Sequence, residues 1–161
     1  MNKNTYFTLA TGVFLEQNRF FPAGQLQAGQ DAIRRLLRTE ARRYLKVVDP
    51  YTNADTLDLL TSVPEGTAAM VLCEMKRNPE SLRKSLLEKV EALRQTGMKM
   101  EVRVDRTGEL HDRYIVTDGA AWMLGHSLKD FGSKDTSVSR LSDVGPLEEA
   151  FNRRWDAAER L

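Results

Sequence analysis

Residues 110–124 read LHDRYIVTDGAAWML, and this stretch decides the fold. Two strand-like apolar runs, Leu110–Thr117 and Ala121–Leu124, leave no room for a helix between them. Asp118-Gly119 separates the two runs and is a strong signal for a tight hairpin turn. The sequence therefore predicts an antiparallel hairpin at this point of the chain.

The length of the turn decides which residues of the hairpin face each other. A two-residue turn brings His126 opposite His111, and one more residue in the turn brings Ser127 there instead. Either register returns Gly125 to the side of His111. Because Gly125 has no side chain, we expect it to let a ligand approach the backbone.

Strands and helices alternate before this hairpin. Because strands joined by helices run parallel, this part of the chain predicts a parallel sheet. The expected strands are 44–48, 68–73 and 98–104, and the expected helices are 31–46, a short one capped by Asn53, and one that Asn78-Pro79 opens and Gly97 closes.

The whole pattern predicts an α/β sandwich with a mixed, mainly parallel central sheet and helices on both faces. The hairpin makes the sheet mixed, and a strand at 136–141 and a helix from Gly145 complete it. We expect a single domain over residues 1–161, in which residues 1–23 are an N-terminal extension or an extra strand.

Composition and charge leave several classes of partner open. The 24 basic residues nearly cancel the 23 acidic ones, so net charge neither favours nor excludes nucleic acid. The basic residues of the helix expected at 31–46 form the largest local cluster, which we interpret first as a solvated face.

Cysteine usage and hydropathy indicate an intracellular protein. Cys73 is the one cysteine, so no disulfide can form within the chain, which fits a reducing compartment. We expect Cys73 to pack as a small apolar residue on a buried strand. Because we find neither a signal peptide nor an apolar run of about 18 residues, we expect a cytoplasmic location.

The residues with the most suggestive chemistry are His111 and Arg113. Side chains alternate along a strand, so these two share one face of the strand expected at Leu110–Thr117. A histidine can act as a nucleophile or proton carrier, and a guanidinium can clamp a phosphate beside it. This pair predicts a site for an anionic phosphodiester.

The spacing of these residues resembles a known family motif. His111, Arg113 and Asp118 stand at the spacing H-x-K-x4-D of the phospholipase D superfamily, and Gly125 follows Asp118 at the distance of the motif's glycine. The chain from about Gln25 onward resembles one domain of that superfamily. It is similar to a branch of bacterial single-domain proteins and, more loosely, to a domain of some eukaryotic MIT-domain proteins that bind membranes without cleaving them.

The resemblance implies a phosphodiesterase or nuclease mechanism that needs neither metal nor cofactor. In active members of the superfamily two motifs meet across a twofold axis, where one histidine attacks phosphorus and the other protonates the leaving oxygen. The resemblance implies His111 as nucleophile or general acid, Arg113 as phosphate clamp, and Asp118 as an orienting and structural group. With one motif in the chain, a complete catalytic site requires a homodimer.

Three departures from the motif argue against turnover. Arg113 replaces the lysine, His126 stands where serine is expected, and Leu128 replaces an asparagine. The arginine fork keeps the charge but is bulkier and differently aimed. We therefore predict a module that binds a phosphodiester or serves assembly, and keep the homodimeric hydrolase as the alternative. The expected ligand-binding residues are Gly125, His126, Ser127 and Lys129.

Nucleic acid is the first choice of ligand and a phospholipid headgroup the second. An assembly role within a larger protein or complex is a third class, and the sequence does not reveal the partner. A metal site at His111 and His126 has little support, because their spacing fits no metal-binding motif. Trp122 and Tyr114 are expected to pack in the core at the hairpin.

Overall fold

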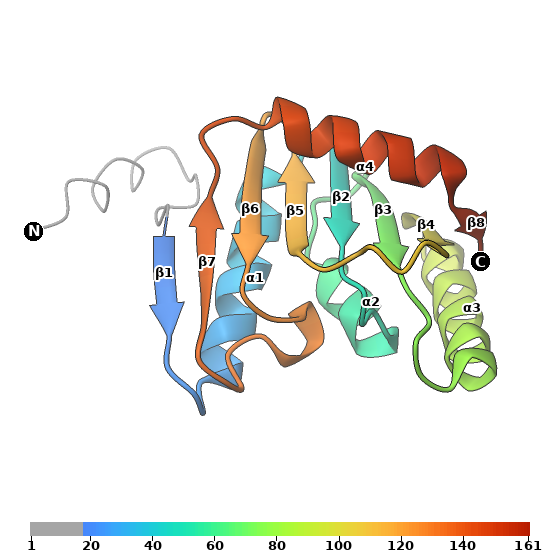
Figure 1. Ribbon diagram of the computed structural model, residues 1–161, viewed down its shortest axis with the longest axis horizontal. Helices are drawn as coiled ribbons and strands as arrows, with labels where there is room; N and C mark the ends of the chain where they lie inside the picture. Colours follow the sequence, from blue (N-terminus) through green and yellow to red (C-terminus); the bar gives the residue numbers. More distant parts are fainter. Residues whose placement is uncertain (1–17) are drawn as a thin grey trace, which may run out of the picture.

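The computed structural model describes residues 18–161 and contains one sheet of eight strands between helices (Figure 1). The strands are β1 (Asn18–Phe21), β2 (Tyr44–Val48), β3 (Ala68–Cys73), β4 (Lys99–Val104), β5 (Arg113–Thr117), β6 (Ala120–Leu124), β7 (Thr136–Arg140) and β8 (Glu159–Arg160). The helices are α1 (Leu26–Glu40), α2 (Ala54–Leu60), α3 (Pro79–Gln95) and α4 (Gly145–Ala157), with a 3-10 turn η1 (Leu128–Asp130). The expected α/β sandwich with a mixed sheet is confirmed.

The strand order is β1-β7-β6-β5-β2-β3-β4-β8, and its parallel part is smaller than expected. Only β2 with β3 and β3 with β4 pair in parallel, whereas the other neighbours are antiparallel. A short strand at each edge, β1 and β8, adds an antiparallel pair, and of these two strands only β8 was not expected from the sequence.

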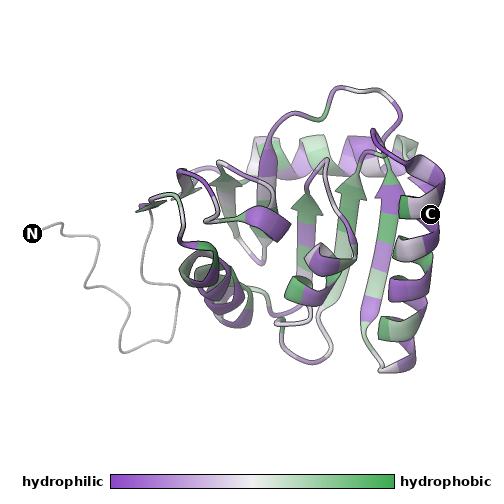
Figure 2. Cartoon of the chain, turned by 90° about the horizontal axis from the view of Figure 1, so that it is seen from below, coloured by the Kyte–Doolittle hydropathy of each residue, from purple (hydrophilic) through white to green (hydrophobic). Residues whose placement is uncertain are grey.

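Helices cover both faces of the sheet, which Figure 2 shows from the lower edge of Figure 1. The larger core lies under α1, α2 and α3 and contains apolar residues of β1 to β7, among them Trp122 of β6. The smaller core contains Phe151 and Trp155 of α4 packed against Val48, Leu72 and Tyr114. Trp122 and Tyr114 are therefore core residues, as predicted.

The hairpin of β5 and β6 has the predicted two-residue turn. Thr117 pairs with Ala120, and Gly119 has φ 92°, a conformation that favours glycine. The ladder ends where Arg113 pairs with Leu124. The expected strand start at Leu110 is wrong, because side chains outside the ladder hold the segment before Arg113 in a loop.

Helix α1 begins at Leu26 and ends at Glu40, whereas the sequence predicted a helix over 31–46. Its first turn packs closely against the loop after η1, where a Cβ on Gly29 would lie 2.4 Å from the carbonyl oxygen of Phe131. The basic residues that follow Glu40 do not belong to the helix, and Lys46 instead pairs with Glu148 of α4 at 2.7 Å.

Two further predictions concern the chain start and the cysteine. Strand β1 at Asn18–Phe21 is an extra strand paired with β7, and residues 1–17 of the expected extension lie outside the described residues. Cys73 is buried on β3, and burial, followed by the charges of Asp49 and Glu74, raises the pKa of its thiol to about 12. Between residues 18 and 161, no helix combines the length and hydropathy needed to cross a bilayer.

Candidate functional site

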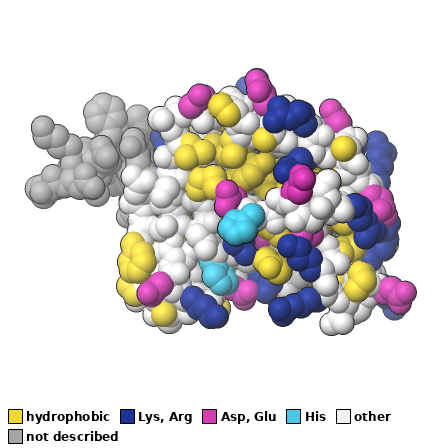
Figure 3. Space-filling view, viewed as in Figure 1, with side chains coloured by type: hydrophobic (Ala, Val, Ile, Leu, Met, Phe, Trp, Pro, Cys, Tyr) yellow, Lys and Arg dark blue, Asp and Glu magenta, His cyan; other side chains and the backbone are white. Residues whose placement is uncertain are grey.

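The candidate site lies at the lower edge of the sheet in Figure 1, where β2, β3, β4 and β6 end and β5 begins. Four loop segments meet there. They are the turn at 49–52 after β2, residues 74–76 after β3, the loop at 105–112 before β5, and the loop at 125–135 after β6. Figure 3 shows both histidines of the chain on one face of the molecule, with Lys and Arg side chains nearby.

Asp49 is the buried centre of this edge. One carboxylate oxygen, Oδ2, accepts hydrogen bonds from Ser127 Oγ and from the Leu128 backbone, both at 2.8 Å. The other oxygen, Oδ1, accepts the Tyr51 backbone N–H at 3.0 Å. A single carboxylate thus fixes the turn after β2 against the loop after β6, although Asp49 and Ser127 are 78 residues apart in the sequence.

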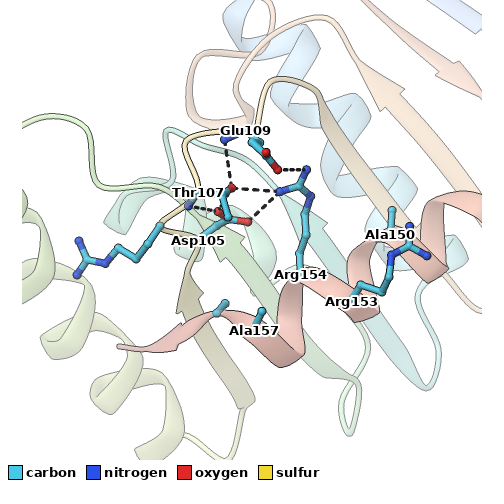
Figure 4. A pocket seen from close by; sticks show the side chains of 9 residues that line it. Asp105, Thr107, Glu109, Ala150, Arg153, Arg154 and Ala157 are labelled. Atoms are coloured by element: carbon cyan, nitrogen blue, oxygen red, sulfur yellow. Dashed lines mark hydrogen bonds and ion pairs between the residues drawn. The ribbon is translucent and has the colours of Figure 1, made fainter.

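The loop before β5 is held from two sides. Glu74 Oε1 accepts the backbone N–H of Leu110 at 3.0 Å. From α4, Arg154 reaches Asp105 at 3.2 Å and Glu109 at 3.4 Å (Figure 4). Burial raises the pKa of Asp105, but hydrogen bonds from Thr107 and Arg154 outweigh burial and hold that pKa below its ordinary value. These contacts keep residues 105–112 out of the ladder.

His111 therefore lies in a loop and not on the strand where the sequence predicted it. Its side chain is 93% exposed, and the contact made by its ring is Nδ1 to Asp112 Oδ1 at 3.1 Å. Because the ladder stops at Arg113–Leu124, His111 and His126 both lie beyond its end and do not form the expected cross-strand pair. Gly125 lies one residue past Leu124, the last residue of β6 that pairs with β5.

Arg113 is half-buried at the start of β5. Its guanidinium carbon lies 5.2 Å from the centre of the Tyr51 ring, and its Nε is buried without a hydrogen-bond partner. Within residues 18–161 no carboxylate forms an ion pair with Arg113. A partly desolvated cation is thus left without an anion.

Lys76 adds a second positive charge from the end of β3. Its Nζ forms an ion pair with Glu74 Oε2 at 2.8 Å, and this interaction with Glu74 raises the pKa of Lys76. The charge of Tyr51 acts in the same direction, and the charge of Arg113 lowers the pKa. Lys76, Tyr51 and Arg113 are therefore close enough to interact electrostatically, although they come from three different strand ends.

The other residues predicted to bind a ligand have different surroundings. A Cβ on Gly125 would lie 2.9 Å from Thr136 Oγ1, so the missing side chain makes room for β7 and not for a ligand, contrary to expectation. Ser127 is buried and bonded to Asp49, and Lys129 pairs with its neighbour Asp130. His126 is half-buried, with its Nδ1 lacking a hydrogen-bond partner.

Asp118 lies at the opposite end of β5 from His111. The five residues of β5 separate them by about 17 Å of extended chain. Its carboxylate accepts the backbone N–H groups of Arg43 at 2.8 Å and Tyr44 at 3.1 Å, which ties the hairpin tip to the start of β2. The contacts of Asp118 are structural, and it does not orient His111.

Tyr51, Lys76 and the buried acids of this edge were not among the site residues predicted from the sequence. A signal was available, since the three parallel strands are each followed at once by an acid. These acids are Asp49, Glu74 and Asp105, and all three are buried. Polar residues at the carboxyl ends of parallel strands commonly form sites, because those ends meet at one edge.

In the described part of the chain, no group of three or more His, Cys, Asp or Glu side chains is arranged to hold a metal ion. The raised pKa of Cys73 keeps its thiol protonated near neutral pH, so that it is a poor nucleophile.

Comparison with known proteins identifies the architecture. No family model matches the sequence, and no curated protein matches it significantly.

Among solved structures, the phospholipase D family member Nuc from Salmonella typhimurium superposes with a TM-score of 0.65 at 12% identity, covering 89% of this chain and 97% of Nuc. TrmBL2, an archaeal chromatin protein with a novel mode of DNA binding, superposes with a TM-score of 0.60 at 19% identity over 91% of this chain. The chain spans about half the length of TrmBL2, since the match covers 54% of that protein. Identities this low establish the fold alone, and the fold of this chain is phospholipase D-like.

Proposed function

We propose that the lower edge of the sheet binds a phosphodiester group of a nucleic acid, with Arg113 as the main phosphate contact. The observation that carries this proposal is the half-buried Arg113 guanidinium, which has no carboxylate partner in the described structure and a buried Nε without an acceptor. Leaving a polar group desolvated and unpaired costs free energy, so an incoming anion stabilises the site.

Lys76 extends the positive surface toward β3. Although it pairs with Glu74, its side chain is 45% exposed and is free to contact a second oxygen of the ligand. A guanidinium binds phosphate oxygens through two parallel N–H donors, whereas an ammonium acts as a point charge. The two cations together suit a phosphate that carries two non-bridging oxygens.

Nucleic acid remains the preferred ligand over a phospholipid headgroup. The likeness in fold to TrmBL2, described as a DNA-binding chromatin protein, is compatible with this choice. A test compares fluorescence polarisation of labelled DNA and RNA oligonucleotides with sedimentation of the protein on anionic vesicles, all at low salt. Binding to vesicles but not to nucleic acid would favour the headgroup, and no binding at all would leave an assembly role.

Binding without turnover is supported by the surroundings of His111. A catalytic histidine is usually held in one orientation by its neighbours, but the side chain of His111 is 93% exposed, and within residues 18–161 its hydrogen-bonding contact is with the adjacent Asp112. Phosphoryl transfer through phosphohistidine also needs a second, acidic histidine across the phosphate. His126 is half-buried beyond the ladder end, and its Nδ1 has no hydrogen-bond partner in the described structure.

The alternative is a metal-independent phosphodiesterase that acts as a twofold dimer. The observation that favours it is the contact of His111 Nδ1 with Asp112 at 3.1 Å, because a carboxylate on one ring nitrogen makes the other nitrogen a better nucleophile. This alternative predicts hydrolysis of a generic phosphodiester in EDTA, loss of that activity in His111→Ala, and a dimer by light scattering. A monomer without turnover supports the binding module.

A further inference from the structure

We infer that Tyr51 is a stacking platform for an unpaired nucleobase, so that the site takes single-stranded nucleic acid in preference to duplex. This inference rests on the proposed binding of a phosphodiester at Arg113. It adds a second contact, made to the base and not to the backbone, and it names a residue that selects the form of nucleic acid.

The Tyr51 side chain is exposed in an unusual place. Large hydrophobic side chains with high exposure among residues 18–161 are Phe20, Leu26, Tyr51 and Leu87, and Tyr51 is 41% exposed. Of these four, Tyr51 is the one that follows a parallel strand at the edge where Arg113 and Lys76 lie. An exposed aromatic ring beside cations offers a surface that is both apolar and attractive to phosphates.

The turn that carries Tyr51 is rigid. Asp49 Oδ1 accepts the backbone N–H of Tyr51 at 3.0 Å, and the Asp49 carbonyl oxygen accepts the Thr52 hydroxyl at 2.8 Å. Pro50 and Thr52, the neighbours on either side, are buried. Because the turn is already fixed, an incoming base orders little further chain, which lowers the entropic cost of stacking.

Arg113 and Tyr51 can contact the same nucleotide. The Arg113 guanidinium lies over one face of the Tyr51 ring, with its carbon 5.2 Å from the ring centre, so a phosphate on Arg113 is next to the ring and a base would stack on the ring's other face. A nucleotide carries its base beside its phosphate, and stacking of bases on aromatic side chains next to a basic groove is the usual mode of single-strand binding. In a duplex the bases are paired and stacked on each other and do not reach the ring.

The test uses three labelled probes of equal length and charge per strand: a single-stranded oligodeoxynucleotide, an abasic oligonucleotide with the same backbone, and the duplex of the first strand. Fluorescence polarisation is measured with the wild-type protein, with Tyr51→Leu, and with Tyr51→Phe, which keeps the ring and removes the hydroxyl. Unfolding in urea checks that each variant is folded, and Arg113→Ala reports on the phosphate contact separately.

We expect the wild-type protein to bind the single strand more tightly than either the abasic probe or the duplex. Tyr51→Leu should lose about 5- to 150-fold in affinity for the single strand, which is the range expected for one stacked base. The same variant should bind the abasic probe as the wild-type protein does, and Tyr51→Phe should keep the wild-type affinity for every probe.

Equal affinity of the wild-type protein for the base-bearing and abasic strands would overturn the inference, and so would an equal loss on both probes in Tyr51→Leu. In either case, weaker binding of Arg113→Ala to the abasic probe would still support the proposed function. Failure of every probe to bind would overturn both proposals.

Discussion

Asp49 holds the turn after β2 and the loop after β6 together at the lower edge of the sheet. It is fully buried and accepts hydrogen bonds from Tyr51, Ser127 and Leu128 through its carboxylate. A buried network of one carboxylate and three donors stabilises the fold only when every hydrogen bond is made. Loss of the acceptor leaves its donors buried and unsatisfied.

Replacement of this carboxylate should therefore destabilise the protein strongly. Asp49→Ala leaves the Ser127 hydroxyl and two backbone N–H groups without an acceptor, and we expect the free energy of unfolding to fall by about 3 kcal/mol. Ser127→Ala removes a single donor and is the matched control, with an expected loss of about 1 kcal/mol. Urea denaturation measures both values. Similar losses in the two variants would show that Asp49 is not the centre of this network.

Among the elements, the loop at 105–112 is stabilised mainly by a helix that lies far from it in sequence. Arg154 of α4 contacts Asp105, Thr107 and Glu109 (Figure 4), while Glu74 holds the backbone of Leu110. This loop carries His111 to the site at the lower edge of the sheet. Helix α4 runs across the upper part of the sheet in Figure 1, yet through Arg154 it takes part in placing His111.

The contact between Arg154 and Asp105 should make stability depend on pH. Because the folded pKa of Asp105 is lowered, its stabilising contribution is complete above the ordinary carboxyl pKa of about 3.9 and is lost as the pH falls through the lower folded value. We expect Arg154→Ala to cost about 1 kcal/mol at neutral pH and less in acid. Urea denaturation at both pH values checks this, with the exposed Arg153→Ala as control. A cost that does not change with pH would contradict this account.

The sequence predicted the elements that depend on local chemistry. Asp118-Gly119 specified a two-residue turn, Asn53 specified a capped helix, and Gly97 specified a left-handed helix end with φ 91°. It did not predict that β5 starts at Arg113, since that boundary depends on contacts of Glu74 and Arg154 with a loop that is distant from both in sequence.

The candidate site was predicted in part for the same reason. The motif predicted that Arg113 and Gly125 lie at one edge. They do, because Arg113 begins β5 and Gly125 directly follows β6, which pairs with β5. It also included Asp118, although a five-residue strand separates Asp118 from that edge. Tyr51 and Lys76 were missed because their closeness to Arg113 follows from the order of β2, β3 and β5 in the sheet, which the local pattern does not contain.

For the whole molecule, local placement of charge matters more than its total. The net charge is +1, so long-range attraction of nucleic acid is weak and affinity must come from the few cations at the site. Two basic residues of the central strands are paired with acids, Lys46 with Glu148 and Arg103 with Glu101. Arg113 differs from them because no carboxylate in the described structure neutralises it.

The salt dependence of oligonucleotide binding tests the central claim most directly. Each phosphate contact contributes about one unit to the slope of log affinity against log salt concentration. For Arg113→Ala we predict about tenfold weaker binding at low salt and a slope smaller by about one, whereas Arg153→Ala on α4 should match the wild-type protein. An Arg113→Ala variant with wild-type affinity and wild-type slope would contradict the assignment of this edge as the phosphodiester site.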